Sequence, residues 1–438
     1  MIWKDRKTTF FIYAPYECAA VEEYLEQMAE KGWLLQGVKG PLFKFKRIVP
    51  QKIKYSVDAL NKISIFDHKD PEVALEYREY CKTAGWTYIC QTGKIQIFYA
   101  DDYEKITPIH TDDSEKFKTV FKSSLYEVIN QLCIVIIFIF NIYTQLFWGN
   151  ADFLLSSNFM IMSIVAMFSL VFVNIIKSIS FFLWVIKARK NLKENKFTPY
   201  NDYKQLRIKN ILLKIYMVVL LLILFSFLVL DEYISKSVPI AVFIIVFVFI
   251  IFIIYVQIFI NKKKYSKITN MIIIISSSIA SIFLLLILIV STVIWSNPHI
   301  QQNEFPNEQS TLTLMDFGYK EGNDEDNYTD FNKSVLAKSE DYSFGNKNNY
   351  LSYTLFQSKY PWVVGFHKNR LLNRITKHNT DLIKEDSNLP RNIKVYSYKN
   401  KKFFILVSDD NVVKITKSFS NIRDDEFLNI VYNKLFND

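Results

Sequence analysis

The sequence predicts a multi-domain membrane protein, in which a block of five transmembrane α-helices separates two α+β domains. The chain has 438 residues, of which 50% are hydrophobic and 16% aromatic. Its apolar residues gather between about Lys122 and Pro298 instead of being spread along the chain. A soluble protein distributes them at helix or strand period and interrupts them with charges. The two flanks do alternate in this way and are expected to fold as domains.

Five apolar segments are long enough to span a membrane, because crossing about 30 Å of hydrocarbon takes about 20 apolar residues. They are residues 125–148, 156–180, 211–230, 238–260 and 271–295. The last three are almost free of charge, which is rare in a buried helix of a soluble protein. The second lies within a longer apolar run, residues 153–186. We interpret that run as one span, since dividing it would leave two short spans and disrupt the charge pattern of the loops.

Basic residues occupy alternate connections between these segments and indicate their orientation. They precede the first segment and follow the second and the fourth, at Lys116, Lys118, Lys122, Lys187, Arg189, Lys190, Lys193, Lys196, Lys204, Arg207, Lys209, Lys262, Lys263, Lys264 and Lys267. The opposite loops carry Asp152, Asp231 and Glu232 instead. Cytoplasmic loops are enriched in Lys and Arg. The pattern predicts a multi-pass protein of a bacterial cell membrane with a cytoplasmic N-terminus and an extracytoplasmic C-terminus.

Net charge and cysteine content exclude two common classes of site. The formal net charge is +10, but the basic residues lie beside apolar segments, where they favour contact with anionic lipid over nucleic acid. Three of the four cysteines precede the apolar block and Cys133 lies within it, without CxxC or zinc spacing. We therefore expect neither a direct nucleic-acid partner nor a structural metal site.

Residues 1–105 alternate strand and helix signals. Strands are expected at 8–13, 33–35, 42–48, 53–57, 87–90 and 95–99, with one helix ending at Gly32 and a second beginning near Asp70 and ending at Gly85. Each helix is followed by the same pair, Gly32-Trp33 and Gly85-Trp86. We interpret the order as βαββαβ, the ferredoxin-like pattern of an antiparallel sheet covered by two helices. A juxtamembrane linker is expected at residues 106–124.

The two glycine-tryptophan pairs are candidate structural or interaction residues. Gly32 and Gly85 suit the left-handed conformation that commonly ends a helix. Trp33 and Trp86 are best explained as core side chains behind each helix end. Stacking of a ligand on either indole is the less favoured alternative.

Four short stretches of this domain match a known pattern. They are Phe11-Ile12-Tyr13-Ala14-Pro15, Met28-Ala29-Glu30-Lys31-Gly32-Trp33, Tyr55-Ser56-Val57-Asp58 and Ala84-Gly85-Trp86. Together they resemble an uncharacterised bacterial family, the domain-of-unknown-function family "twenty-eight twelve", over about the first quarter of the chain. The resemblance implies a module joined to membrane spans, often encoded beside PadR-type transcriptional regulators, in a regulatory or stress-response role. It implies no catalytic residues.

The C-terminal flank is expected to contain a tether at residues 296–310 and an extracytoplasmic α+β domain at 311–438. A short strand is expected at 360–364, a basic helix around 368–377, a β-meander at 394–398, 401–407 and 412–417, and a final helix that begins at Asp424. The acidic stretch 317–330 lacks the order of ligands that calcium loops require. A solvated loop is favoured there over a calcium site.

Three ionisable residues lie near the expected spans, and such residues mark functional sites in many membrane proteins. They are Glu127, Lys177 and Lys214. Each lies close to a predicted cytoplasmic end, where a long side chain reaches the interface. We therefore favour an interfacial role for them over a proton or ion pathway, and keep them as candidate intramembrane polar residues.

No catalytic signature is present. The sequence lacks a phosphate-binding loop, a dinucleotide fingerprint, a nucleophile elbow and a two-histidine metal helix. We expect no enzyme and no cofactor, and predict a transmembrane regulatory or sensory protein that couples an extracytoplasmic domain to a cytosolic interaction module. An accessory or permease-like component of a transport system is the alternative. The expected partners are the bilayer and a cytosolic protein, with a transcriptional regulator system as a candidate; a homo-oligomer is left open.

Overall fold

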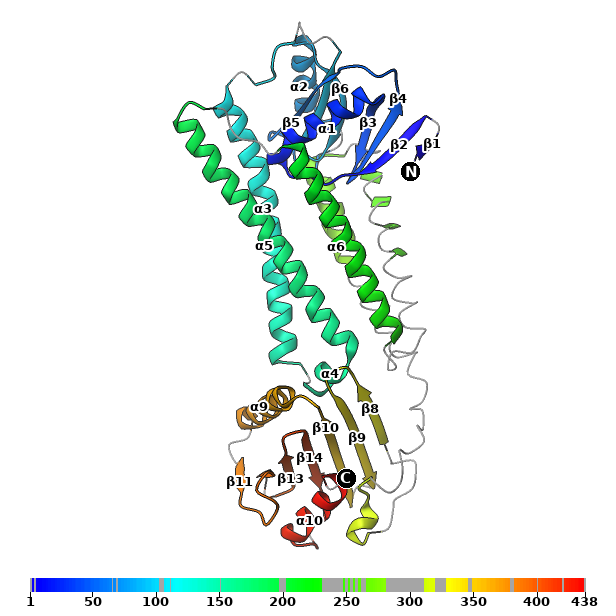
Figure 1. Cartoon of the computed structure of the whole chain (residues 1–438), viewed down its shortest axis with the longest axis vertical. Coiled ribbons are helices and arrows are strands. Elements are labelled where there is room, and N and C mark those ends of the chain that lie inside the picture. Colours follow the sequence, from blue (N-terminus) through cyan, green and yellow to red (C-terminus); the bar gives the residue numbers. More distant parts are fainter. Residues whose placement is uncertain are drawn as a thin grey trace. The chain divides into compact units, whose positions relative to one another are not determined.

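The computed structural model (Figure 1) divides into two compact units, each described by itself. Unit 1 contains residues 1–138, 168–222 and 242–290; unit 2 contains residues 139–167, 223–241 and 291–438. The structure describes residues 2–3, 5–64, 66–67, 70–101, 106–110, 112–149, 151–196, 202–230, 247–248, 251–252, 255–256, 259–260, 265–280, 311–319, 328–345, 349–378, 382–399, 401–419 and 421–436.

The N-terminal domain in unit 1 contains two sheets. The first half runs β1 (Ile2–Trp3), β2 (Arg6–Phe10), η1 (Pro15–Glu17), α1 (Cys18–Glu30), β3 (Trp33–Lys39) and β4 (Leu42–Arg47). The second half runs β5 (Lys54–Ala59), α2 (Glu72–Thr83), β6 (Thr87–Thr92) and β7 (Ile95–Ala100). The strand orders are β1-β2-β4-β3 and β5-β7-β6, and all pairs are antiparallel.

The two halves repeat one βαββ unit. In each, the last strand lies between the first strand and its own hairpin partner. The two repeats also share a β-bulge at the same position. It lies between Leu35 and Gly37 in β3 and between Tyr88 and Cys90 in β6, and in each strand it begins two residues after the tryptophan. The sequence echo of Gly-Trp pairs therefore marks a structural repeat.

The predicted ferredoxin-like βαββαβ sheet is not what the structure shows. The strand segments and both helices are found close to their expected positions, but β5 begins the second repeat instead of completing the first sheet. Strand order depends on pairing between distant segments, and the local pattern carries no information on it.

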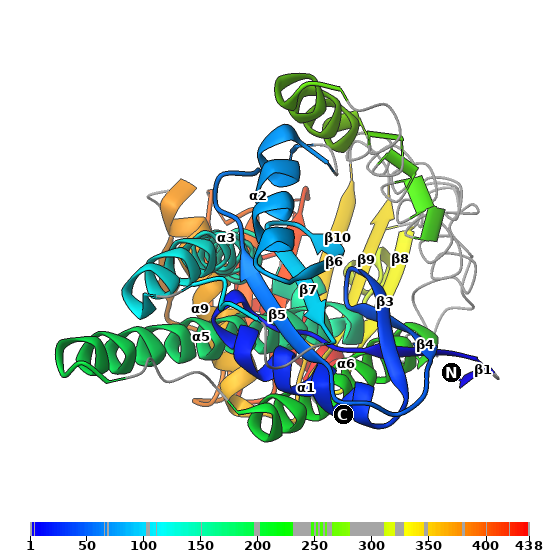
Figure 2. The ribbon, with the colours of Figure 1, turned by 90° about the horizontal axis from the view of Figure 1, so that it is seen from above.

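A shared core joins the two repeats. Helix α1 packs on β3 of its own repeat and on β5 of the other (Figure 2), and β3 lies beside β6. The buried side chains of α1 include Val21, Leu25 and Met28, which pack in one core with Phe43 and Phe45 of the first sheet. Helix α2 covers a smaller cluster that contains Cys81, Trp86 and Phe98.

Three long helices follow: α3 (Asp113–Phe147), α5 (Asn158–Lys193) and α6 (Tyr203–Leu230), with the short α4 (Ala151–Ser156) between the first two. Among the described residues, α3 and α5 are the helices long and apolar enough to cross a membrane. Their apolar side chains are largely exposed, with Phe140 and Phe172 at 61% and 65%. That exposure is expected for lipid-facing helices and is unlike the core helix of a soluble protein.

Of the five predicted spans, only the first two correspond to candidate spans among the described residues; the third, within α6, is not one of them, and the fourth and fifth are described only in part. Residues 211–230 lie within α6, and residues 271–280 lie within a helix, Lys267–Ala280. Most of the fourth segment and residues 281–295 of the fifth lie outside the described residues, as do the tether at 296–310 and much of the acidic stretch at 317–330.

The C-terminal domain in unit 2 is built on one antiparallel sheet of seven strands, in the order β11-β12-β13-β14-β10-β9-β8. Its elements are η2 (Leu314–Phe317), β8 (Tyr328–Lys333), β9 (Lys338–Gly345), β10 (Tyr350–Gln357), α9 (Pro361–His378), β11 (Ile383–Glu385), β12 (Lys394–Tyr398), β13 (Phe403–Val407), β14 (Asn411–Lys417) and α10 (Asp424–Leu435). The expected α+β class, the meander and the final helix are confirmed.

The predicted strand at residues 360–364 is wrong, because residues 361–364 form the first turn of α9 and Tyr360 precedes it. Proline is favoured at the first position of a helix, and Val363 and Val364 then face the sheet with Ile375. Helices α4 and α9 cover this face of the sheet, whereas α10 and η2 cover the other face with Phe427 and Phe317. The domain therefore has three layers.

Candidate functional site

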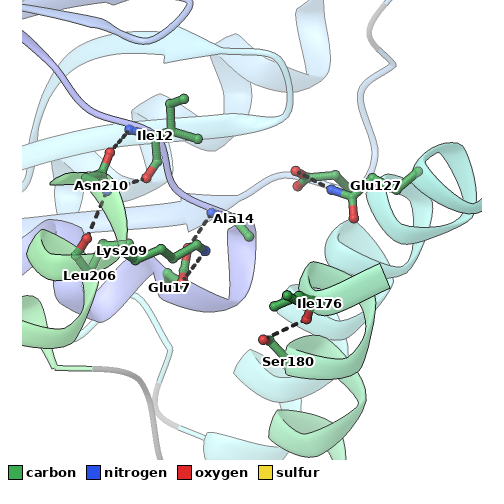
Figure 3. Close-up of polar contacts among 10 residues, drawn as sticks. Ile12, Ala14, Glu17, Glu127, Ile176, Ser180, Leu206, Lys209 and Asn210 are labelled. Carbon is green, nitrogen blue, oxygen red and sulfur yellow. Dashed lines mark hydrogen bonds and ion pairs between the residues drawn. The ribbon is translucent and has the colours of Figure 1, made fainter. Parts of the chain in front are cut away.

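The segment between β2 and α1, residues 11–17, contacts α3, α5 and α6. Figure 3 shows its bonds to α6. It leaves the first sheet after Phe10 and enters η1, so its backbone groups have no strand partner at Ile12. Polar side chains from α6 and aromatic side chains from α5 and α3 meet it there. We call this contact the N-terminal attachment: residues 11–17 with Phe117, Phe181, Trp184, Lys209 and Asn210.

Asn210 of α6 bonds both backbone groups of Ile12. Its Oδ1 accepts from the Ile12 N–H at 2.7 Å, and its Nδ2 donates to the Ile12 carbonyl at 2.8 Å. The same Nδ2 donates to the carbonyl of Leu206 at 3.0 Å. The side chain is 4% exposed. The Asn210 side chain therefore supplies the two hydrogen bonds that a neighbouring strand would otherwise make with Ile12. Burying these backbone groups without a partner would cost free energy.

Glu17 and Lys209 form a buried ion pair at the same contact. One carboxylate oxygen of Glu17 accepts from Lys209 Nζ at 2.8 Å, and the other accepts from the Ala14 N–H at 2.8 Å. The Glu17 side chain is 1% exposed and that of Lys209 is 31% exposed. A buried carboxylate is tolerated only when paired and hydrogen-bonded, so this pair connects η1 to the start of α6.

Aromatic side chains complete the attachment. Tyr16 stacks on Trp184 of α5 at 5.5 Å between ring centroids and lies 5.9 Å from Phe181. Phe117 of α3 lies 5.5 Å from Trp184. Aromatic pairs at these distances stabilise a contact beyond the area that they bury. The segment is therefore bound to three helices at once.

Two of the three predicted intramembrane residues meet beside this attachment. Glu127 of α3 and Lys177 of α5 line a cavity of about 30 Å³ together with Tyr16 and Lys209. Glu127 accepts from Gln131 Nε2 at 3.4 Å, and no ion pair joins Glu127 to Lys177 among the described residues. The cavity has room for about one or two water molecules. Lys214 lies elsewhere, with its ammonium 5.5 Å from the ring of Phe10.

The four candidate glycines and tryptophans are part of the repeat. Gly32 has φ +81° and Gly85 has φ +92°. A Cβ at Gly32 would lie 2.9 Å from the carbonyl oxygen of Ile48, so only glycine fits there. Trp86 is 6% exposed and its Nε1 donates to the carbonyl of Thr107. Trp33 packs half-buried against the shared core.

A titratable cluster lies in the second repeat, where sequence reasoning had placed none. The Asp58 carboxylate bonds His110 Nε2 at 2.9 Å and accepts from the Tyr77 hydroxyl. Burial raises the pKa of Asp58, but the bonds from His110 and Tyr77 outweigh it and leave that pKa below its ordinary value. The bond from Asp58 raises the pKa of His110 despite its burial.

Unit 2 contains a second attachment, between the α3–α5 connection and the C-terminal domain. Asp152 of α4 pairs with His367 Nε2 of α9. Arg370 Nη2 donates to the carbonyls of Gln145 and Gly149 at the end of α3. The carbonyl of Leu155 accepts from the Ser334 hydroxyl, and Asn158 Oδ1 accepts from the Val335 N–H. We call these contacts the α4 attachment.

Sequence reasoning missed both attachments. Asn210 and Ile12 are 198 residues apart, and His367 and Asp152 are 215 apart. Isolated polar residues at such separations form no motif. The sequence offered one signal, a polar side chain directly beside an apolar segment. That signal selected Glu127 and Lys177 and did not select Asn210 or Asp152.

Comparison with known proteins supports the expected resemblance. Residues 18–132, about a quarter of the chain, match the model of a family described as "Protein of unknown function (DUF2812)", which confirms the resemblance there. The match begins at α1, after the first strand of the first repeat, covers the second repeat and ends within α3. No curated protein and no solved structure matches the chain.

Proposed function

We propose that this chain, whose residues 18–132 are a DUF2812 segment, is a non-enzymatic transmembrane regulatory or sensory protein. In this proposal the C-terminal domain responds to a stimulus outside the cytosol. The helices carry that change to the N-terminal repeats, which engage a cytosolic protein partner. The family resemblance makes a transcriptional regulator system the first candidate for that partner.

The observation that carries the proposal is that α3 and α5 are held by folded domains at both ends. Towards the start of α3 and the end of α5, Phe117 and Trp184 pack on Tyr16 and each other. At their other ends, Arg370 bonds the last turn of α3 and Val335 bonds Asn158 of α5. A helix held at both ends transmits a shift of one end to the other, because helices slide or rotate as rigid elements.

The α4 attachment also supports the proposed topology of five spans, with the N-terminus inside and the C-terminus outside. The C-terminal domain binds the connection between α3 and α5, so it lies on the same side of the membrane as that connection. If α3 crosses the bilayer, its first residue lies on the opposite side. An odd number of spans follows from these two statements.

Transcript profiling of chromosomal variants tests the proposal. We compare a null strain, Asn210→Leu at the N-terminal attachment and Asp152→Asn at the α4 attachment with the parent strain, after confirming that both point variants reach the parent's protein level. The expected result is one shared set of altered transcripts. An unchanged transcript profile in the null strain would contradict the proposal. Altered export of a peptide or drug without a transcript change would favour the transport component instead.

A further inference from the structure

A cavity of about 820 Å³ opens beside the α4 attachment and has an unusual balance of charge. Its basic lining residues are Arg370 and Arg374 of α9, Lys377 near the end of α9, and Lys414 of β14. Its acidic lining residue is Asp152, which His367 already pairs. Among the described residues, none of the four basic side chains forms an ion pair. The cavity therefore carries an excess of positive charge.

Two polar atoms at the cavity are buried and unused. Arg370 Nη1 and His367 Nδ1 have no hydrogen-bond partner among the described residues. Arg370 already uses its other terminal nitrogen on carbonyls at the end of α3. A buried guanidinium nitrogen without a partner is rare in the absence of a ligand or water. Since guanidinium groups match the geometry of phosphate oxygens, the unpartnered Arg370 nitrogen favours a phosphate as the ligand of this cavity.

Aromatic side chains also line this cavity. Tyr143, Phe147 and Trp148, from the last turns of α3 and the residue after it, line the cavity. Phe147 is 61% exposed and Trp148 is 68% exposed. Tyrosine and tryptophan are enriched where a spanning helix meets the lipid headgroups. The cavity therefore combines cationic and aromatic lining residues at the end of a candidate membrane span.

We propose that this cavity binds the phosphate headgroup of an anionic membrane lipid, taken from the leaflet that faces the C-terminal domain. Arg374, Lys377 and Lys414 attract the phosphate, and Arg370 donates to it. The aromatic side chains receive the upper part of the acyl chains. A soluble phosphate would satisfy the cations and leave the exposed aromatic side chains unused. The inference rests on the membrane placement in the proposed function and not on signalling.

Binding is measured on the full chain in neutral detergent by native mass spectrometry, with phosphatidylglycerol and phosphatidylcholine of identical acyl chains. The test variant is Arg374→Gln/Lys377→Gln/Lys414→Gln. The matched control, Lys368→Gln/Lys384→Gln/Lys394→Gln, removes three charges from the same domain outside the cavity lining. Each basic residue near an anionic lipid surface contributes about 1 kcal/mol, or about fivefold in affinity. We expect phosphatidylglycerol binding to weaken by at least about tenfold in the test variant and to persist in the control.

Three outcomes would overturn the proposal. Equal retention of phosphatidylglycerol by the test variant and the control would remove the cavity as its site. Equal retention of the two lipids by the unmodified chain would show an apolar groove without headgroup selection. Displacement of phosphatidylglycerol by glycerol phosphate at equal concentration would assign the cavity to a soluble phosphate compound.

A single Lys414→Gln variant keeps the test valid if the triple variant does not fold, with about fivefold weaker binding expected. The failure of this inference is distinguishable from failure of the proposed function. Lipid binding is read on purified protein and needs no signalling partner. An unchanged transcript profile with selective phosphatidylglycerol binding would reject only the regulatory role.

Discussion

The two attachments both hold α3 and α5, by different chemistry. At the N-terminal attachment, an ion pair, an amide and stacked aromatic rings fill the contact and leave a cavity of about 30 Å³ beside it. At the α4 attachment, a histidine–aspartate pair and one arginine lie beside a cavity of about 820 Å³. The first contact has little room to change, whereas the second has space and an unused guanidinium nitrogen. Under the proposed function, the α4 attachment is therefore the end that would receive a signal.

The comparison first requires that the two attachments lie on opposite sides of the membrane. Asn388 is exposed in the loop before β12, so Asn388→Cys is a suitable probe in a Cys133→Ser background, since the other native cysteines are buried. We expect complete labelling in intact cells by a membrane-impermeant maleimide. Labelling only after lysis would place both domains in the cytosol and reject the outside-to-inside comparison.

The ion pair of the N-terminal attachment is expected to contribute most to the stability of that contact. Lys209→Met leaves the buried Glu17 carboxylate without its cation and should destabilise unit 1 by about 2–4 kcal/mol. The lysine side chain is partly exposed, which places the effect below that of a fully buried pair. Thermal unfolding of the full chain in detergent measures the loss. Lys204→Met at the exposed start of the same helix is the control; an equal loss there would contradict the assignment.

The amide contact should contribute less than the ion pair. Asn210→Leu leaves the Ile12 N–H and carbonyl without partners and should cost about 1–3 kcal/mol. Asn210→Asp keeps the acceptor for the Ile12 N–H and loses the donor, so we expect a loss from its unpaired charge as well. The measurement is the hydrogen exchange rate of the Ile12 amide. It should increase in Asn210→Leu and remain slower in Asn210→Asp than in Asn210→Leu. Equal rates in all three proteins would show that Asn210 does not bind this segment.

The α4 attachment is expected to depend on pH. The pKa of Asp152 is lowered, because the bond and charge of His367 outweigh the opposing effect of burial. Because the pKa of Asp152 is lower in the folded state, the ionised carboxylate stabilises the fold at pH values above its ordinary pKa of about 3.9. This stabilisation is lost as the pH falls through the folded-state pKa. Asp152→Asn should therefore cost about 1–2 kcal/mol near neutral pH and flatten the acid side of the thermal stability profile. An unaltered acid profile would contradict it.

The smallest expected effect lies in the second repeat of unit 1. The bond to Asp58 raises the pKa of His110, so its contribution is complete below about pH 6.5 and is lost as the pH rises through the folded value. His110→Gln should remove about 1 kcal/mol at pH 6 and less at pH 9. Thermal unfolding at both values measures the difference. A loss of the same size at both would show that packing, not charge, holds His110.

Most elements follow from short-range patterns. Both N-terminal helices, their glycine ends and the meander of the C-terminal domain are near their predicted residues. The exception at residues 360–364 shows the limit of that reasoning, because Tyr360, Trp362 and Val363 have strand propensity but Pro361 begins a helix. Packing against the sheet decided between the two conformations.

The sequence by itself determined where the apolar segments lie, which flanks fold, and that the Gly-Trp motif repeats, because hydropathy and periodicity are sums over neighbouring residues. Only the tertiary structure decided that each motif belongs to a βαββ repeat with its own sheet. Only the tertiary structure brought Asn210 to Ile12 and His367 to Asp152. Such contacts join residues about two hundred positions apart, and no local pattern records which distant segment a polar side chain will meet.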